Sequence, residues 1–149
     1  MSTAAAPYTP PLSDTARLLG HLGLLPFVGG AALVWVVNAE AQPYATLALA
    51  GYAAVIVSFL GGIHWGVALR QTAPAASLFI WGVLPSLVAW LAVMMPASAG
   101  LVVQGVMLVA CYAVDRRVYP QQGLAHWLTL RFRLSAVAAL SCFLGAAGS

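Results

Sequence analysis

The chain has 149 residues, of which 62% are hydrophobic and only 6% are charged, and its formal net charge is +3. An average soluble domain has about 45–50% apolar and about 25% charged residues, so this chain cannot cover a water-facing surface with polar groups. The composition excludes a soluble globular enzyme, a nucleic-acid-binding protein and a disordered chain. It leaves a multi-pass membrane protein that contacts membrane lipids.

Five apolar segments are long enough to cross a membrane, since a spanning helix needs about 20 mostly apolar residues. They predict an all-α fold with a single transmembrane domain, residues 14–149, after a disordered tail, residues 1–13. In chain order, the predicted helices cover residues 18–37, 45–69, 77–95, 97–114 and 128–147.

Prolines and charges modify four of these helices. Pro26 in the first and Pro85 in the third each remove one helical hydrogen bond and favour a kink. The fourth is predicted to end before the charged residues that start at Asp115. Arg131 and Arg133 lie in the first turns of the fifth, so a re-entrant or tilted last helix is the alternative to a full span.

The arginines predict the orientation of the chain in the membrane. With five spans, all six arginines fall on one side, while the other side carries Glu40. Cytoplasmic loops carry the excess of positive charge, so the N-terminus is predicted to be cytoplasmic and the C-terminus periplasmic. Residues 1–13 resemble neither a signal peptide nor a transit peptide. We therefore expect a multi-pass protein of the bacterial inner (cytoplasmic) membrane.

Small residues lie on two faces of the second predicted helix. Small side chains at helical spacing let another helix approach closely in lipid. This pattern predicts a central position for the helix and close packing on both faces. The positions are Ser58, Gly62 and Gly66 on one face, and Gly61 and Ala68 with His64 on the other.

A cluster of polar side chains is predicted in the cytoplasmic leaflet. His64 lies about 9 Å inside Arg70, where an imidazole needs a hydrogen-bonding partner. Asp115 lies at the predicted C-terminal end of a helix, where the helix dipole disfavours a negative charge and calls for a cation. We predict that His64, Arg70, Asp115 and Arg131 join the second, fourth and fifth helices, with Trp127 as a cation–π partner of Arg131. A structural and a ligand- or proton-binding role both stay open.

The sequence contains no recognisable catalytic or metal-binding pattern. It shows no nucleophile–base–orienter set, and its three carboxylates lie in separate segments. Cys111 and Cys142 are predicted at different depths, too far apart for a disulfide, and no Cys/His spacing resembles a zinc site. The prediction is a protein that is not an enzyme and that holds no cofactor or metal.

Several motifs resemble an uncharacterised family of small five-helix membrane proteins. The family occurs in proteobacteria and, as the transmembrane-protein-sixty-nine group, in mitochondria. The resemblance implies the five-helix topology and draws attention to His64, Asp115 and Arg131 without giving them a role. A bacterial and mitochondrial distribution is compatible with a place near the respiratory chain. The motifs are LGLLPF (22–27), SFLGGIHWG (58–66), PSLVAW (85–90), DRR (115–117) and WLTLRFRL (127–134).

Three functions are compatible with this pattern. The first is a non-catalytic accessory or assembly protein that binds lipids or a larger membrane complex, with a respiratory complex as one candidate. The second is a binder or carrier of a quinone-like or amphipathic small molecule, with His64 and Arg131 as polar contacts in an apolar cavity beside His64. The third is haem binding through His21 and His64.

Overall fold

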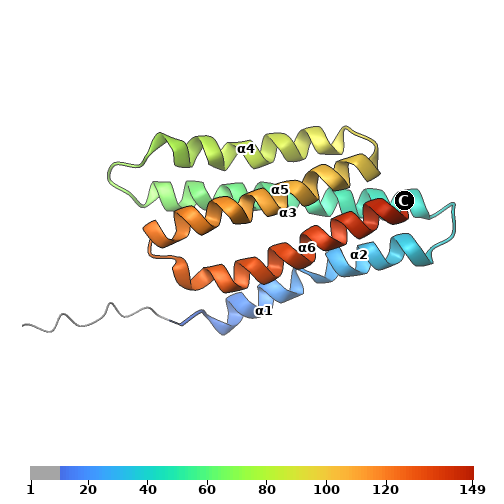
Figure 1. The fold of residues 1–149 in the computed structure, drawn as a ribbon, viewed down its shortest axis with the longest axis horizontal. Helices are drawn as coiled ribbons and strands as arrows, with labels where there is room; N and C mark the ends of the chain where they lie inside the picture. Colours follow the sequence, from blue (N-terminus) through green and yellow to red (C-terminus); the bar gives the residue numbers. More distant parts are fainter. Residues whose placement is uncertain (1–10) are drawn as a thin grey trace, which may run out of the picture.

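The computed structural model describes residues 11–149, and the regular structure in this range is helical throughout. Five segments are long and apolar enough to span a membrane, which confirms the all-α, five-span prediction. Figure 1 shows the long helices running side by side in alternating directions. The elements are α1 (Asp14–Leu22), α2 (Leu25–Val36), α3 (Gln42–Leu69), α4 (Ala76–Val93), α5 (Ala97–Gln121), the 3₁₀ turn η1 (Ala125–Trp127) and α6 (Leu128–Gly148).

The predicted first helix, 18–37, begins earlier and is broken into α1 and α2. The break lies at Gly23 and Leu24, just before Pro26, whose ring nitrogen cannot donate to the preceding turn. The hydroxyl of Tyr52 donates to the Gly23 carbonyl oxygen at 2.8 Å. The predicted tail falls largely on residues 1–10, which lie outside the described residues, and α1 begins directly after Ser13.

The helix α3 is central, because it contacts α2, α4, α5 and α6. Its close approach to α4 occurs at Gly61, where an added Cβ atom would collide with the carbonyl oxygen of Gly82. The other predicted packing face was wrong. Gly62 and Gly66 are exposed, and an added Cβ atom at either would meet no atom within 4 Å, while Ser58 is half-buried. Apart from His64, the side chains near these positions are small or apolar, so the spacing of the small residues alone did not distinguish the two faces.

The predicted end of the fourth spanning helix was also wrong. The helix α5 continues past residue 114 to Gln121, so Asp115 lies inside it instead of at its C-terminal end. Asp115 is buried, whereas the next two residues, Arg116 and Arg117, are exposed. The charges therefore point to different faces of one helix and do not stop it.

The helix α6 has the length of a full span together with η1, which favours a spanning last helix over a re-entrant one. Its two arginines separate as their spacing predicts: Arg131 is buried and Arg133 is exposed. In Figure 1, the start of α1, the end of α3, the end of α5 and the start of α6 lie at the same end of the bundle. All six arginines of the chain lie on or next to these helix ends.

Candidate functional site

A buried ion pair joins α5 and α6. The Arg131 guanidinium donates from Nη2 and Nε to the same carboxylate oxygen, Oδ2 of Asp115, at 2.6 and 2.9 Å. Asp115 is only 1% exposed. Burying a charge inside an apolar bundle costs free energy unless an opposite charge neutralises it. Asp115 and Arg131 therefore each lower the cost of burying the other.

His64 brings α3 to the same carboxylate. Its Nε2 lies 3.4 Å from Oδ1 of Asp115, the oxygen that Arg131 does not use. This distance is within ion-pair range, yet neither ring nitrogen of His64 makes a hydrogen bond within the described part of the chain. The rings of Trp81 and Tyr119 flank the imidazole, with centroid distances of 6.5 and 6.3 Å. We call His64, Asp115 and Arg131 the buried triad.

Two residues predicted to belong to this cluster, Arg70 and Trp127, do not make the predicted contacts. Arg70 follows the last residue of α3, is exposed, and takes no part in the ion pairs of residues 11–149. It comes six residues after His64, which turns it about 120° around the helix axis, away from the triad. Trp127 lies in η1, just before α6, and its ring packs against His126, at 6.0 Å between centroids. A stacking of Trp127 on Arg131 is not among the aromatic contacts of the described residues.

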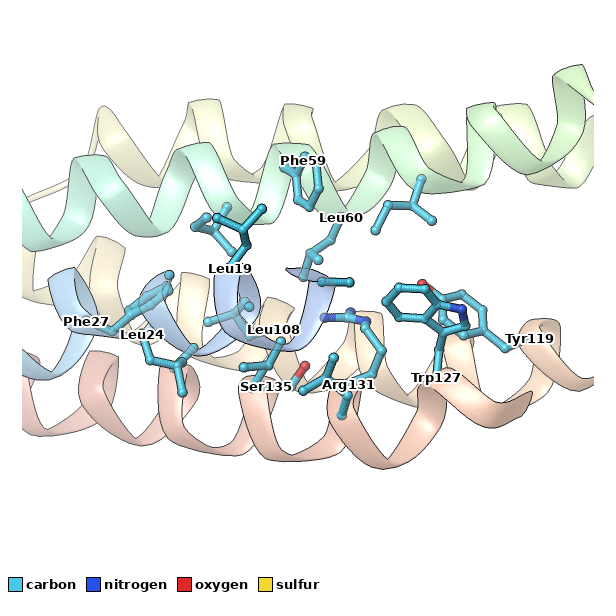
Figure 2. A pocket seen from close by; sticks show the side chains of 18 of the residues that line it. Leu19, Leu24, Phe27, Phe59, Leu60, Leu108, Tyr119, Trp127, Arg131 and Ser135 are labelled. Atoms are coloured by element: carbon cyan, nitrogen blue, oxygen red, sulfur yellow. The ribbon is translucent and has the colours of Figure 1, made fainter. Parts of the chain in front are cut away.

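An apolar cavity of about 540 Å³ is lined by side chains of α1, α2, α3, α5, α6 and η1. Figure 2 shows its side chains converging from these helices, with Phe27 and Leu24 at one end and Trp127 and Tyr119 at the other. Leu19 and Phe59 line the cavity and are 62% and 63% exposed, so the cavity reaches the outer surface of the bundle between α1 and α3.

The polar groups of α6 lie between the two ends of this cavity (Figure 2). Among the described residues that line it, Arg131 is the only charged one, and Ser135 lies one turn further along α6. The Ser135 hydroxyl is buried without a hydrogen-bond partner among residues 11–149, whereas Ser141 of the same helix donates to the Val137 carbonyl oxygen at 2.8 Å. The sequence predicted an apolar cavity beside His64. Of the two predicted polar contacts, Arg131 lines the observed cavity and His64 does not; the His64 ring faces Asp115.

The geometry gives no support to haem binding by His21 and His64. The Nδ1 atom of His21 lies 2.7 Å from the carbonyl oxygen of Arg17, one turn back in α1, and the side chain is exposed. His64 instead faces Asp115 in the interior. The two imidazoles therefore have separate neighbours and do not face a common space.

Residues 12–147 match the family described as "Protein of unknown function (DUF3429)". The chain belongs to the DUF3429 family. This confirms the resemblance seen in the sequence. A curated relative of this DUF3429 protein is Transmembrane protein 69 of Xenopus tropicalis, which is 36% identical over 104 residues, 65% of this chain and 41% of the relative. The chain thus spans about two fifths of the relative's length. No solved structure matches the chain.

Sequence reasoning missed several residues of this DUF3429 site. Tyr119 and Cys111 lie one turn on either side of Asp115 on the buried face of α5, a pattern that the predicted helix end concealed. Gln104 of the same helix lies outside the site, three turns before Asp115; it is fully buried, and neither of its amide atoms has a partner among the described residues. An amide in the middle of an apolar segment was the available signal for it. The sequence could not show that the Ser135 hydroxyl lacks a hydrogen-bond partner, because Ser141 occupies a similar helical setting and is hydrogen-bonded.

Proposed function

We propose that this membrane protein binds an amphipathic small molecule in the cavity beside Arg131. The observation that carries the proposal is an apolar cavity of about 540 Å³ with one cationic side chain in its wall, between its two ends (Figure 2). Small-molecule sites are typically concave, mostly apolar, and roughly 300–1,000 Å³ in volume, with a few polar groups that fix the orientation of the ligand. The apolar part of the molecule would lie along Leu24 and Phe27, and its polar head would lie at Arg131.

The exposed rim supports entry of the ligand from the lipid. Leu19 and Phe59 border the cavity on the outer surface of the bundle, where a spanning protein meets acyl chains. An amphipathic molecule would move sideways from the bilayer into the cavity and keep its apolar part away from water throughout. Both a binding protein and a carrier are compatible with this route.

The clustering of the arginines at one end of the bundle supports the predicted orientation. We place this end of the bundle, which carries Arg131, on the cytoplasmic side, with the C-terminus in the periplasm. The ligand head would then lie in the cytoplasmic leaflet of a bacterial inner membrane. Reporter fusions after residue 119 and after the last residue test this: opposite compartments support it, and a shared compartment contradicts it.

An accessory or assembly role, with another integral membrane protein or complex as partner, stays a prediction, as does the absence of catalysis. Its test is the recovery of a stoichiometric partner after gentle extraction from native membranes. Ligand binding and an accessory role are compatible, because a ligand can be presented to a larger complex.

A cavity-filling substitution tests the ligand-binding proposal. Ile63→Trp places an indole in the wall of the cavity, and Val55→Trp places the same ring on an exposed face of the same helix. We expect Ile63→Trp to lower the amount of co-purified small molecule by about tenfold, a loss of about 1.4 kcal/mol in binding. The measurement is native mass spectrometry of protein extracted from native membranes.

Val55→Trp is the matched control and should retain the ligand of the unmodified protein. The proposal fails when the unmodified protein carries no small molecule, or when Ile63→Trp retains as much as Val55→Trp. Thermal unfolding of both variants shows whether the indole in the cavity has changed the fold.

A further inference from the structure

We propose that the ligand is an acid on an apolar chain, and that one proton binds His64 when the acid binds Arg131. This inference rests on the proposed function, because it names the chemistry of the ligand in the same cavity. Without ligand, the buried triad contains one ion pair, Arg131 with Asp115. With ligand, it would contain two: the acid head with Arg131, and Asp115 with protonated His64.

The charge of the cavity wall favours an anionic head. Arg131 is the only charged residue in the wall, and Asp115 lies behind it, outside the wall. A molecule that enters from the lipid therefore meets a cation before it meets the compensating carboxylate. Hydrogen bonds between a guanidinium and an anionic oxygen are about twice as strong as those between neutral groups, so an acid gains more here than an alcohol or an ester.

Two donors from α6 are available in the cavity wall. The hydrogen bonds of Arg131 within residues 11–149 use Nε and Nη2, which leaves Nη1 for the ligand. Ser135 is 5% exposed, lines the cavity, and its hydroxyl has no partner in the described part of the chain. Figure 2 shows Arg131 projecting from α6 toward Leu60 of α3, with Ser135 beside it. A buried hydroxyl is normally hydrogen-bonded, and the head of an acid supplies the missing acceptor.

Charge balance then requires a proton. Arg131 and Asp115 together are neutral, so a bound anion would leave one uncompensated negative charge in an apolar interior, at a large cost. His64 is 2% exposed, and its Nε2 lies 3.4 Å from the free oxygen of Asp115. A proton taken from bulk water by this imidazole restores neutrality: R–COO⁻ and H⁺ enter, and both stay bound.

The titratable and charged groups that face His64 come from α5 and α6. From α5 it faces Asp115 and Tyr119, with Cys111 one turn before Asp115, and from α6 it meets Arg131 through Asp115. The helices α2 and α4 carry no titratable side chain, and α4 contributes Trp81. Histidine is the side chain that ordinarily changes charge between about pH 5 and 8, so His64 is the acceptor that neutral pH makes available.

Calorimetry of the unmodified full chain in phosphatidylcholine nanodiscs measures this proton directly. Palmitate is titrated in two buffers of different ionisation enthalpy, with empty nanodiscs as the blank, and hexadecanol serves as the matched neutral probe. We expect uptake of about one proton per bound palmitate near neutral pH, and none with hexadecanol. Palmitate should also bind more tightly than hexadecanol.

Two substitutions change the proton count in a defined way. His64→Gln removes the acceptor, so palmitate should bind about tenfold or more weakly and without proton uptake, while hexadecanol binding changes less than about twofold. Asp115→Asn leaves Arg131 as an uncompensated cation, so palmitate should bind that variant without a proton. The control is His21→Gln, the same chemical change at an exposed position of α1.

The outcomes separate this inference from the proposed function. Equal binding of palmitate and hexadecanol, or binding of palmitate without proton uptake, overturns the inference and leaves the proposed function intact. Binding of neither probe, together with no co-purified small molecule, defeats both. Phosphatidylglycerol is the third probe: tighter binding of palmitate identifies a free acid as the source of the head group, and tighter binding of phosphatidylglycerol identifies a phospholipid. Proton uptake with either acid supports the inference.

Discussion

Replacement of Arg131 by glutamine is expected to lower the free energy of unfolding by about 3–5 kcal/mol, because it leaves the buried Asp115 carboxylate without its cation. Arg133→Gln is the matched control: it removes the same charge two residues away, from a side chain that is exposed. The measurement is the thermal or denaturant unfolding of each variant in the same detergent.

A second variant separates loss of charge pairing from loss of packing. The double substitution D115N/R131Q removes both charges, so it should recover most of the stability that Arg131→Gln loses, since the orphaned carboxylate is gone. Arg131→Gln with the stability of Arg133→Gln would show that the ion pair does not hold α5 and α6 together.

Gly61→Ala is expected to destabilise the protein by about 1–3 kcal/mol, because the new methyl group would collide with the Gly82 carbonyl oxygen and force α3 and α4 apart. Gly62→Ala, the adjacent position, meets no atom within 4 Å and gains helix propensity. It should therefore be neutral or stabilising by up to about 1 kcal/mol.

Both substitutions add one methyl group at adjacent positions of the same helix. Their expected effects on the free energy of unfolding have opposite signs, so the comparison isolates the contact at Gly61. Unfolding midpoints in one detergent measure it. Equal effects at both positions would show that α3 and α4 are not in backbone contact at Gly61.

Composition and segment length predicted the fold because the bilayer restricts which structures can cross it. Long apolar segments must be helical and must cross, so five spans could be counted from the sequence alone. The orientation of each helix about its own axis could not be predicted in the same way. The residues on the inner and outer faces of α3 are equally apolar or small, so Gly61 and Gly62 are indistinguishable until a neighbour is placed against one of them.

Part of the site was predictable because charges are rare in this chain. Asp115, His64 and Arg131 had few alternative partners in an apolar interior, and the structure brings these three together. Arg70 was wrongly predicted to join the cluster, because its depth in the membrane was considered without its angle around the axis of α3. An apolar cavity was predicted beside His64, but its actual position had no signal in the sequence, since it arises where side chains from five helices leave the space between them unfilled.

The Asp115–Arg131 pair has a consequence for biogenesis. The two residues are 16 positions apart and belong to consecutive helices joined by a short turn. A ribosome completes α5, with its carboxylate, before the matching guanidinium of α6 has been synthesised. A lone aspartate within a membrane segment opposes entry into the bilayer. The insertion machinery should therefore hold α5 at its exit until α6 arrives, and release the two as one hairpin.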